Sequence, residues 1–408
     1  MSLTQLIGIV TTKKSMNDSS AFDFIYNFYA VSGRTAFTKR TLGSSGKFEW
    51  SDIELIIDAF IQTGTIETEY DYVCNSESNH EQASTIPFQC DFCKKKVVIS
   101  DSEHIIEAVY TLKTDFIGEL LQYKESRVNS YIHSDYIPIF DLLKKSKHNL
   151  IPFLGAGVSV PFGLPTWKGM FLELAQYVKE SSKEDYEDLV NRGDFFSAID
   201  FMLMGNSTLF RNEEQIQRHI SLKFQDPDLQ IDENSHNMKD IAKLNADFYV
   251  TTNYDNILIN FFEGRRVNPI NLPEVYNMPD LFKERCQRVV HIHGNVDRYR
   301  TMIVTQNQYS DLYESEDYVD RLKLILTQKS LVFIGYSFRD EFFVKLFQNI
   351  VPRLGGDHFF IAPNINEHTA HKFGQEFNLH SISLNLPKAY STQEYVTALK
   401  FLLKELEP

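Results

Sequence analysis

From about residue 135 onward, short apolar runs alternate with amphipathic stretches. Residues 136–149 have the apolar spacing of a helix and lead into Leu150-Ile-Pro-Phe-Leu154, which predicts a short buried strand in front of glycines. Further strands are predicted from apolar runs at residues 248–252, 289–293, 301–305, 331–335 and 359–363. Such runs, separated by helical stretches, are typical of a parallel sheet covered by helices on both faces. We therefore expect an α/β fold of the Rossmann type here.

The first 130 residues show a different pattern. Between Phe48 and Gly64 the apolar residues fall at helical spacing, with Ser51 as a possible N-cap. Residues 65–73 then alternate like a strand, and a cysteine-containing segment follows. A helix followed by a hairpin predicts a small α+β domain of winged-helix-like or zinc-ribbon-like type. We expect one domain over residues 1–130 and a second over residues 135–408.

Composition narrows the class of protein. The 43% hydrophobic and 24% charged residues are those of an ordinary soluble globular protein. No stretch approaches the roughly 18 apolar residues of a membrane helix, and the N-terminus lacks a basic segment followed by an apolar one. Four cysteines are too few for a disulfide framework in 408 residues. These features predict a cytoplasmic protein that does not contact a membrane. The formal charge of -14 argues against direct nucleic-acid binding.

Glycine-rich and polar motifs follow several of the predicted strands. Gly155-Ala-Gly-Val-Ser159 comes directly after the first strand, and Gly163-Leu-Pro-Thr-Trp-Lys168 precedes a helix. Glycines let backbone amides approach a pyrophosphate, and Ser159 adds a hydroxyl donor. The same pattern also occurs in plain strand-to-helix turns, so this motif alone leaves both interpretations open.

Three later motifs lie at predicted strand ends, where ligands of open α/β sheets gather. They are Thr251-Thr-Asn-Tyr-Asp255, His291-Ile-His-Gly294 and Gly335-Tyr-Ser337. Asp255 can equally cap the following helix, and Ser337 can cap a turn. A strand-end histidine suits acid–base chemistry, but His291 and His293 share a face and one of them is expected to be structural.

Taken together and in this order, the motifs over residues 135–400 resemble the sirtuin fold, and most closely the sirtuin-like NADase domains of bacterial anti-phage defence. The resemblance implies that Asn253 and His293 form the catalytic pair. It also implies contacts with NAD⁺ from a set of other residues: Gly155, Ala156, Gly157, Ser159, Trp167, Thr252, Asp255, Gly294, Gly335 and Ser337. The implied reaction is cleavage of the bond between nicotinamide and ribose.

Deacylating sirtuins carry a four-cysteine zinc module after the HG motif, but this chain has no cysteine between Gly294 and Gly335. Its GLPTWK segment also replaces the GIPDFR typical of deacylases. Hydrolysis of NAD⁺ by water is therefore favoured. An NAD-dependent protein deacylase and a non-catalytic nucleotide-binding module remain as alternatives.

The N-terminal cysteines suggest a metal. Cys90-Asp-Phe-Cys93 is a CxxC pair, and Cys74 with either His80 or His104 could complete a tetrahedral zinc site. Unligated cysteines in a hairpin are the alternative, and Cys286 is expected to be a buried apolar residue.

Uncontrolled NAD⁺ loss would harm the cell. We therefore expect the N-terminal domain to have a regulatory or interaction role and the protein to form a homo-oligomer or to bind a sensor. The resemblance implies an ATPase, an Argonaute-type protein or a phage protein as the sensor.

Overall fold

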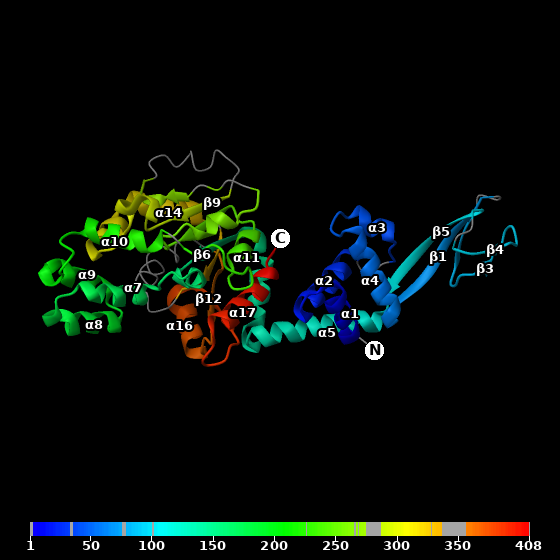
Figure 1. Cartoon of the computed structure of the whole chain (residues 1–408), viewed down its shortest axis with the longest axis horizontal. Coiled ribbons are helices and arrows are strands. Elements are labelled where there is room, and N and C mark those ends of the chain that lie inside the picture. The colour runs from blue at the N-terminus through cyan, green and yellow to red at the C-terminus, as the bar shows by residue number, and fades with distance from the viewer. Residues whose placement is uncertain are drawn as a thin grey trace. The chain divides into compact units, whose positions relative to one another are not determined.

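The structure is a computed structural model that describes residues 3–32, 36–75, 79–99, 102–225, 227–264, 267, 269–274, 287–327, 329–336 and 356–407. The chain forms two compact units, Met1–Val128 and Asn129–Pro408 (Figure 1). Among the described helices, none combines the length and the apolar character needed to cross a membrane.

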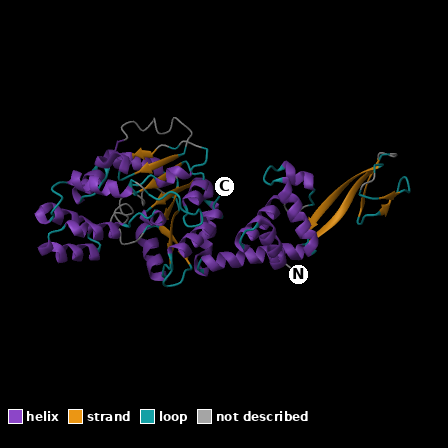
Figure 2. Ribbon diagram, in the orientation of Figure 1, coloured by secondary structure: helices purple, strands orange, loops and turns teal. Residues whose placement is uncertain are grey.

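The second unit is built on a seven-stranded parallel sheet, which confirms the predicted α/β fold (Figure 2). The strands lie in the order β12-β11-β10-β6-β7-β9-β8. Their bounds are Leu150–Leu154 (β6), Phe248–Thr251 (β7), Pro269–Asn271 (β8), Arg288–His291 (β9), Ser330–Ile334 (β10), His358–Pro363 (β11) and Leu379–Leu384 (β12). The glycine motif therefore leaves the central strand β6, between the motifs that follow β7 and β10.

Alternate residues of these strands pack on opposite faces of the sheet. Phe153, Val250 and Phe333 belong to a core formed with α14 (Glu316–Leu326) and α16 (Glu367–Phe377). The strands β6, β7, β9 and β10 are buried along most of their length. A strand that is buried on both faces has a nearly continuous run of apolar residues. The apolar runs in the sequence therefore predicted these strands.

Two features of the sheet differ from the sequence prediction. Residues 301–305 form no strand; their apolar side chains Met302 and Val304 instead pack into a helical cluster, and Thr305 caps α13 (Gln306–Glu314). The strands β8 and β12 were not predicted. β8 has only three residues, and in β12 the buried Ser381 and Ser383 interrupt the apolar run.

The helical cluster precedes β7 in the sequence and contributes one wall of the cavities described below. Its helices pack around Phe171, Tyr186 and Ile199, and Tyr254 from the loop after β7 joins them. The cluster comprises α7 (Trp167–Leu174), α8 (Lys183–Arg192), α9 (Phe195–Phe201) and α10 (Glu213–Phe224). Other helices of this unit are α6 (Ile137–Lys145), α11 (Met238–Lys243) and α17 (Thr392–Lys404).

The first unit has the predicted α+β character. An antiparallel sheet in the order β2-β1-β5 extends from the helices, and the hairpin of β3 and β4 lies at its far end (Figure 1). The expected helix is α4 (Trp50–Thr63), but Ser51 lies inside it and Glu49 occupies the N-cap, so the predicted cap is wrong. The remaining elements are α1 (Leu3–Lys14), α2 (Asp18–Ser32), α3 (Lys39–Ser44), β1 (Ile66–Cys74), β2 (Asn79–Ala83), β3 (Phe88–Gln89), β4 (Lys96–Val97), β5 (His104–Leu112) and α5 (Thr114–Tyr131).

Candidate active site

The glycines after β6 and β10 allow two loops to approach each other closely. The amide of Gly155 donates to the Ile334 carbonyl and that of Gly157 to the Gly335 carbonyl, both at 2.9 Å. A Cβ on Gly155 would lie 2.7 Å from the carbonyl oxygen of Gly335, and one on Gly157 2.8 Å from it. Gly335 itself has φ +76°, a conformation that favours glycine. Loop packing alone therefore requires these glycines, and phosphate binding by them stays a prediction.

Most backbone amides of this loop already have partners within the protein. The loop forms two short turns of 3₁₀ helix. In the first of them, the Val158 amide donates to the Gly155 carbonyl and the Ser159 amide donates to the Ala156 carbonyl. Ala156 lines both cavities described below. Gly157 and Val160 also line the larger cleft, so several residues of this loop border it.

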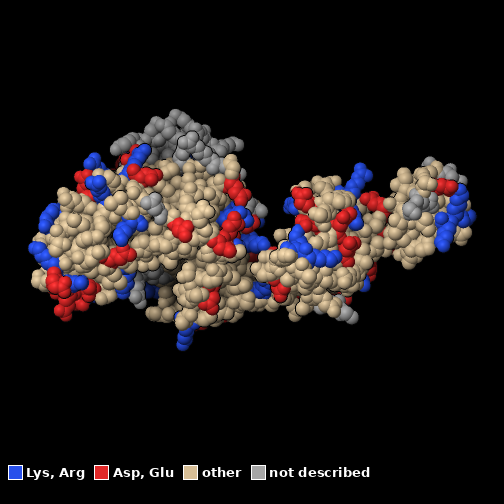
Figure 3. Space-filling model, in the orientation of Figure 1, with Lys and Arg blue, Asp and Glu red and all other residues tan. Residues whose placement is uncertain are grey.

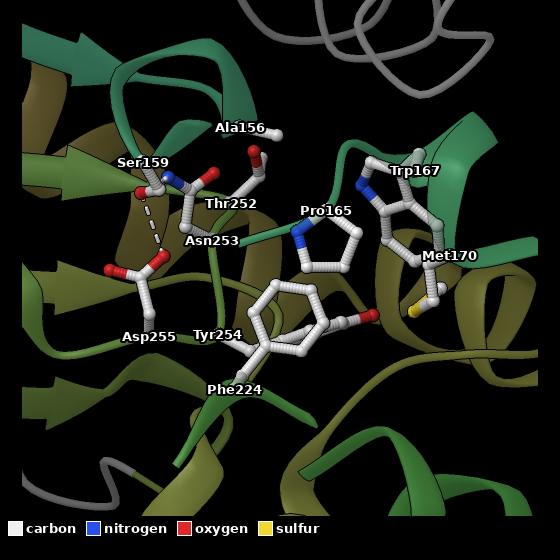
Figure 4. Close-up of a pocket in the computed structure, with 10 residues that line it drawn as sticks. All are labelled: Ala156, Ser159, Pro165, Trp167, Met170, Phe224, Thr252, Asn253, Tyr254 and Asp255. Atoms are coloured by element: carbon white, nitrogen blue, oxygen red, sulfur yellow. Dashed lines mark hydrogen bonds between the residues drawn. The ribbon is translucent and has the colours of Figure 1, made fainter. Parts of the chain in front are cut away.

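Ser159, Asn253 and Asp255 form one hydrogen-bonded cluster (Figure 4). The Asn253 side-chain amide donates to the Gly155 carbonyl at 3.0 Å and to Ser159 Oγ at 3.1 Å. Ser159 Oγ in turn donates to Asp255 Oδ2 at 2.8 Å. The Asn253 amide is thus fixed through its nitrogen, while its oxygen points away from Ser159 (Figure 4). The Ser159 hydroxyl is engaged by Asp255 in this structure.

Asp255 is a buried carboxyl group. Burial raises its pKa above the ordinary value, and hydrogen bonds from Ser159 and from the amide of Ile257 partly offset that effect. Asp255 makes the turn contact that the sequence suggested, because its Oδ1 accepts a hydrogen bond from the Ile257 amide at 3.1 Å. The second oxygen accepts the hydrogen bond from Ser159, and contact of Asp255 with NAD⁺ stays a prediction.

The two histidines of the HG motif lie in different surroundings. His291 is fully buried, and its Nδ1 lies 2.8 Å from the Asn253 carbonyl oxygen, so a proton on Nδ1 would hold the Asn253 backbone in place. His293 lies between two tyrosines, with Nε2 2.7 Å from the Tyr313 hydroxyl and Nδ1 2.8 Å from the Tyr309 hydroxyl. Burial lowers the pKa of His291 to about 4 and that of His293 to about 3. Both imidazoles are therefore neutral at pH 7.

His293 and Asn253 come from neighbouring strands, since Thr251 of β7 pairs with His291 of β9 and each predicted residue follows two positions later. Gly294 turns the chain after His293 with φ +80°, and a Cβ there would lie 2.2 Å from the Thr301 carbonyl oxygen. Neither His293 nor Gly294 is among the described residues that line the two cavities below. Ser337 and Cys286 lie outside the described residues.

Two adjoining cavities lie at the carboxyl ends of β6, β7 and β10. The smaller has a volume of about 20 Å³ and is lined by Ser159, Asn253 and Asp255 together with apolar side chains, including Pro165 and Met170 (Figure 4). That volume holds about one water molecule. The larger cleft has a volume of about 750 Å³, within the range of small-molecule and cofactor sites. Ala156, Trp167 and Thr252 line both cavities.

The shared wall contains two further predicted residues. Trp167 stacks on Phe171 with ring centroids 5.6 Å apart and meets the edge of Tyr254 at 5.7 Å. The Thr252 hydroxyl lies 3.0 Å from that of Tyr336, which donates to the Leu154 carbonyl. The structure thus brings Gly155, Gly157, Ser159, Trp167, Thr252, Asn253, Asp255 and Gly335 to one end of the sheet.

Sequence reasoning missed several residues of the larger cleft. Lys168 and Arg192 line it and carry positive charge, and Tyr336 and Tyr395 line it too. Lys168 belongs to the quoted GLPTWK segment, so its position directly after Trp167 was an available signal. Arg192 and Tyr395 lie far from every motif, and only the fold brings them to the cleft.

The predicted metal ligands lie in the other unit. Cys74, Cys90 and Cys93 lie together with His104, not with His80. The His80 side chain is exposed on β2 and faces Asp71.

Comparisons with known proteins agree with this architecture. A family model described as "SIR2-like domain" matches residues 247–382, which begin before β7 and include β9, β10 and β11. Proteins named "NAD(+) hydrolase ThsA" from Cytobacillus dafuensis, Enterococcus faecium and Acinetobacter baumannii are 26%, 26% and 25% identical to this chain. The matches cover 53%, 50% and 51% of this chain but only 42%, 40% and 40% of those proteins. The chain thus spans about two fifths of the length of these relatives. With its seven-stranded parallel sheet and its motifs at the strand ends, the second unit of the chain contains a SIR2-like domain.

Proposed function

We propose that this chain is an NAD⁺ hydrolase that cleaves the bond between nicotinamide and ribose. The observation that carries the proposal is the fixed Asn253 amide in a water-sized cavity that adjoins a cofactor-sized cleft. The names of the relatives support the same activity. The products are nicotinamide, ADP-ribose and one proton, with the new oxygen on the ribose coming from water.

The larger cleft suits a dinucleotide. Its position beyond the carboxyl ends of parallel strands is where open α/β sheets bind ligands. Lys168 and Arg192 supply positive charge for the pyrophosphate, and Arg192 also pairs with Asp188. In the proposed complex the nicotinamide end lies against Trp167 and Thr252, because these residues border the smaller cavity.

The smaller cavity suits the attacking water. Asn253 presents its side-chain oxygen there, with the nitrogen held by Gly155 and Ser159. Cleavage passes through an oxocarbenium-like state in which positive charge develops on the ribose. Asp255 lines the same cavity, and its hydrogen-bond partners Ser159 and Ile257 carry no charge. An ionised Asp255 would therefore favour that positive charge.

His293 has the role of general base in this proposal because of the family resemblance. Its imidazole is neutral, as a base must be before it accepts a proton, but the pKa of about 3 that burial gives it lies well below the pH at which a general base works best. His293 is enclosed by its two tyrosine contacts and lines neither cavity, so the role requires that the imidazole exchange a tyrosine contact for a contact with substrate.

The first test is incubation of purified protein with NAD⁺ and separation of the products by chromatography. We expect wild type to release nicotinamide and ADP-ribose, and Asn253→Ala to lose at least about 100-fold in turnover, as positioned catalytic groups typically contribute. Asn260→Ala is the matched control. In the described structure the Asn260 side chain donates only to the carbonyls of Asn256 and Ile257, at the start of its own 3₁₀ helix. Absence of NAD⁺ cleavage by folded wild type would refute the hydrolase proposal, and equal turnover by wild type and a folded Asn253→Ala variant would refute the role of Asn253.

The role of His293 needs a separate pair of variants. His293→Gln retains hydrogen-bonding groups for Tyr309 and Tyr313 but no titratable group, whereas His293→Ala retains neither. If His293 is the base, both variants are inactive although the glutamine variant folds normally. Full activity of His293→Gln would show that the histidine only supports the fold.

In the cell, we propose that the enzyme depletes NAD⁺ during phage infection as an effector of abortive defence. The N-terminal unit is the proposed regulatory or interaction part, and assembly into a homo-oligomer or with a sensor protein is the proposed switch. Infected cells that express wild type should lose NAD⁺, whereas cells with Asn253→Ala should retain it. Unchanged NAD⁺ in both infected cultures would argue against this role while leaving the hydrolase activity untouched.

A further inference from the structure

Three cysteines and one histidine meet at the end of the sheet in the N-terminal unit. The ligand atoms of Cys74, Cys90, Cys93 and His104 all lie within 4.8 Å of one another. Cys93 Sγ and His104 Nε2 are 3.4 Å apart. A tetrahedral zinc site places two sulfurs about 3.8 Å apart and a sulfur and a nitrogen about 3.5 Å apart, given its usual bond lengths. The four ligand atoms thus lie close to the spacing that zinc requires.

Two separate elements deliver these ligands. Cys74 is the last residue of β1 and His104 the first of β5, and the two are direct partners in the antiparallel register. Directly opposed residues project from the same face of a sheet. Their side chains therefore lie side by side although 30 positions separate them in the sequence.

Cys90 and Cys93 come from the turn between β3 and β4. The Cys90 amide donates to the Lys95 carbonyl at 2.9 Å, and the Lys94 amide donates to the Cys90 carbonyl at 3.0 Å. Lys94 has φ +59°, which tightens the turn. The backbone amides of Phe92 and Cys93 also hydrogen-bond the Cys90 sulfur. A turn that directs two thiols to one point and places amides on a sulfur is suited to hold a metal.

The apolar core around this cluster is small. It contains the buried residues Tyr72, Cys74, Cys90 and Val97, and β3 and β4 have two residues each. Small modules of this size usually need a disulfide or a metal for stability. The three cysteines are not joined by disulfides. A metal would supply the missing cross-link between the hairpin and the ends of β1 and β5.

We infer that Cys74, Cys90, Cys93 and His104 bind one Zn²⁺ as a structural site of the N-terminal unit. Thiolate and imidazole ligands in tetrahedral number favour zinc among the common cellular metals. Four protein ligands leave no open position, so the metal fastens the hairpin and takes no part in catalysis. Binding releases the thiol protons to solvent.

The charge of the surroundings agrees with this site. Zn²⁺ with three thiolates and a neutral histidine has a net charge of about -1. Lys94, Lys95 and Lys96 are exposed directly after the last cysteine, and Lys and Arg atoms gather at this end of the unit in Figure 3. Lys95 pairs with Glu103, so Lys94 and Lys96 are the lysines of this run that could offset that negative charge.

The test is the zinc content of the full chain, purified without a metal-binding tag under reducing conditions and passed over a chelating resin. We expect about one zinc per chain for wild type, with loss of most of it in Cys90→Ser and His104→Ala. His104→Cys should keep the metal, because a four-cysteine set also binds zinc. His80→Ala is the matched control, because His80 is an exposed histidine of the same sheet that lies outside the cluster.

Cobalt substitution gives a second readout that does not depend on NAD⁺ cleavage. Co²⁺ should produce sulfur-to-metal absorption bands in wild type and in His80→Ala but not in Cys90→Ser. A wild-type zinc content below about a tenth per chain after reconstitution, or equal zinc in wild type and His104→Ala, would overturn the inference. Because zinc content is measured directly, a failure of the NAD⁺ hydrolase proposal would leave this result unchanged.

Discussion

Asp255 shows how burial sets the chemistry of a single residue in this site. Burial raises its pKa, which means that ionising the carboxyl costs the folded state free energy. The stabilising contribution of the protonated group is complete below the ordinary pKa of about 3.9 and is lost as pH rises through the raised folded value.

Replacing Asp255 with asparagine removes this titration. We expect the free energy of unfolding of wild type to fall relative to that of Asp255→Asn as pH rises from about 4 toward 7. Chemical denaturation of both proteins at a series of pH values measures the difference. A difference that does not change with pH would show that Asp255 titrates at its ordinary value.

Lys168 permits a test of substrate binding that is separate from the chemistry. Since Lys168 lines the cleft beside Trp167, we expect Lys168→Gln to raise the KM for NAD⁺ by about 5- to 20-fold with little change in kcat, as loss of uniform binding does. Lys168→Arg should stay near wild type. A lowered kcat at unchanged KM would place Lys168 in a different role.

Several residues of the candidate site lie in motifs that the sequence shows, but their contacts were not predictable. Asn253 and Ser159 belong to motifs visible in the sequence, yet their hydrogen bond joins positions 94 residues apart, and the bond from Ser159 to Asp255 spans 96. These contacts form because β6 and β7 are neighbours in the sheet. The order of strands in a sheet cannot be predicted from a local sequence pattern. For the same reason the enclosure of His293 by Tyr309 and Tyr313 could not be foreseen.

At the scale of elements, the junction of the loops after β6 and β10 shapes the cleft. Gly335 combines φ +76° with a near contact, because a Cβ there would lie 2.8 Å from the Val158 nitrogen. Gly163 has nearly the same φ, +75°, but open space around the same position. Comparing an alanine substitution at each glycine therefore separates two contributions to lost stability. Gly163 reports the left-handed backbone alone, and Gly335 reports the same backbone together with the close contact.

We expect Gly163→Ala to lose about 1–2 kcal/mol of stability from the backbone conformation alone. Gly335→Ala should lose a further 1–3 kcal/mol or so from the forced shift of the two loops. Urea denaturation of both variants measures these values. Equal losses would mean that the loops move apart freely and that their close approach is not required.

Apolar runs predicted the strands β6, β7, β9, β10 and β11 because these strands are buried on both faces. The same criterion failed for residues 301–305, since burial in a helical cluster produces an equally apolar segment. It also failed for β12, where serines occupy buried positions. Hydrophobicity thus locates buried segments, but it does not say which of them are strands.

At the scale of the whole molecule, buried neutral histidines set the response to acid. Burial lowers the pKa of His358 to about 4, that of His291 to about 4 and that of His293 to about 3. The unfolded chain protonates these groups near pH 6.5. Their contribution to stability is therefore present above about pH 6.5 and is lost as pH falls toward the folded values.

His358 offers a clean measurement, since it lies at the start of β11 and its Nδ1 accepts from the Leu331 amide at 3.3 Å. In His358→Asn the side-chain oxygen can take over that contact without titrating. We expect wild type to lose stability relative to this variant as pH falls from about 7 to 4, by up to about 1.4 kcal/mol per pH unit. A constant difference over that range would mean that His358 titrates at its ordinary pKa in the folded protein.

The most direct test of the central claim is a crystal structure of Asn253→Ala with NAD⁺. The account predicts the pyrophosphate and adenosine in the larger cleft beside Lys168, and the bond between nicotinamide and ribose next to residue 253 and Trp167. NAD⁺ bound outside both cavities, or bound with its nicotinamide end turned away from residue 253, would contradict it.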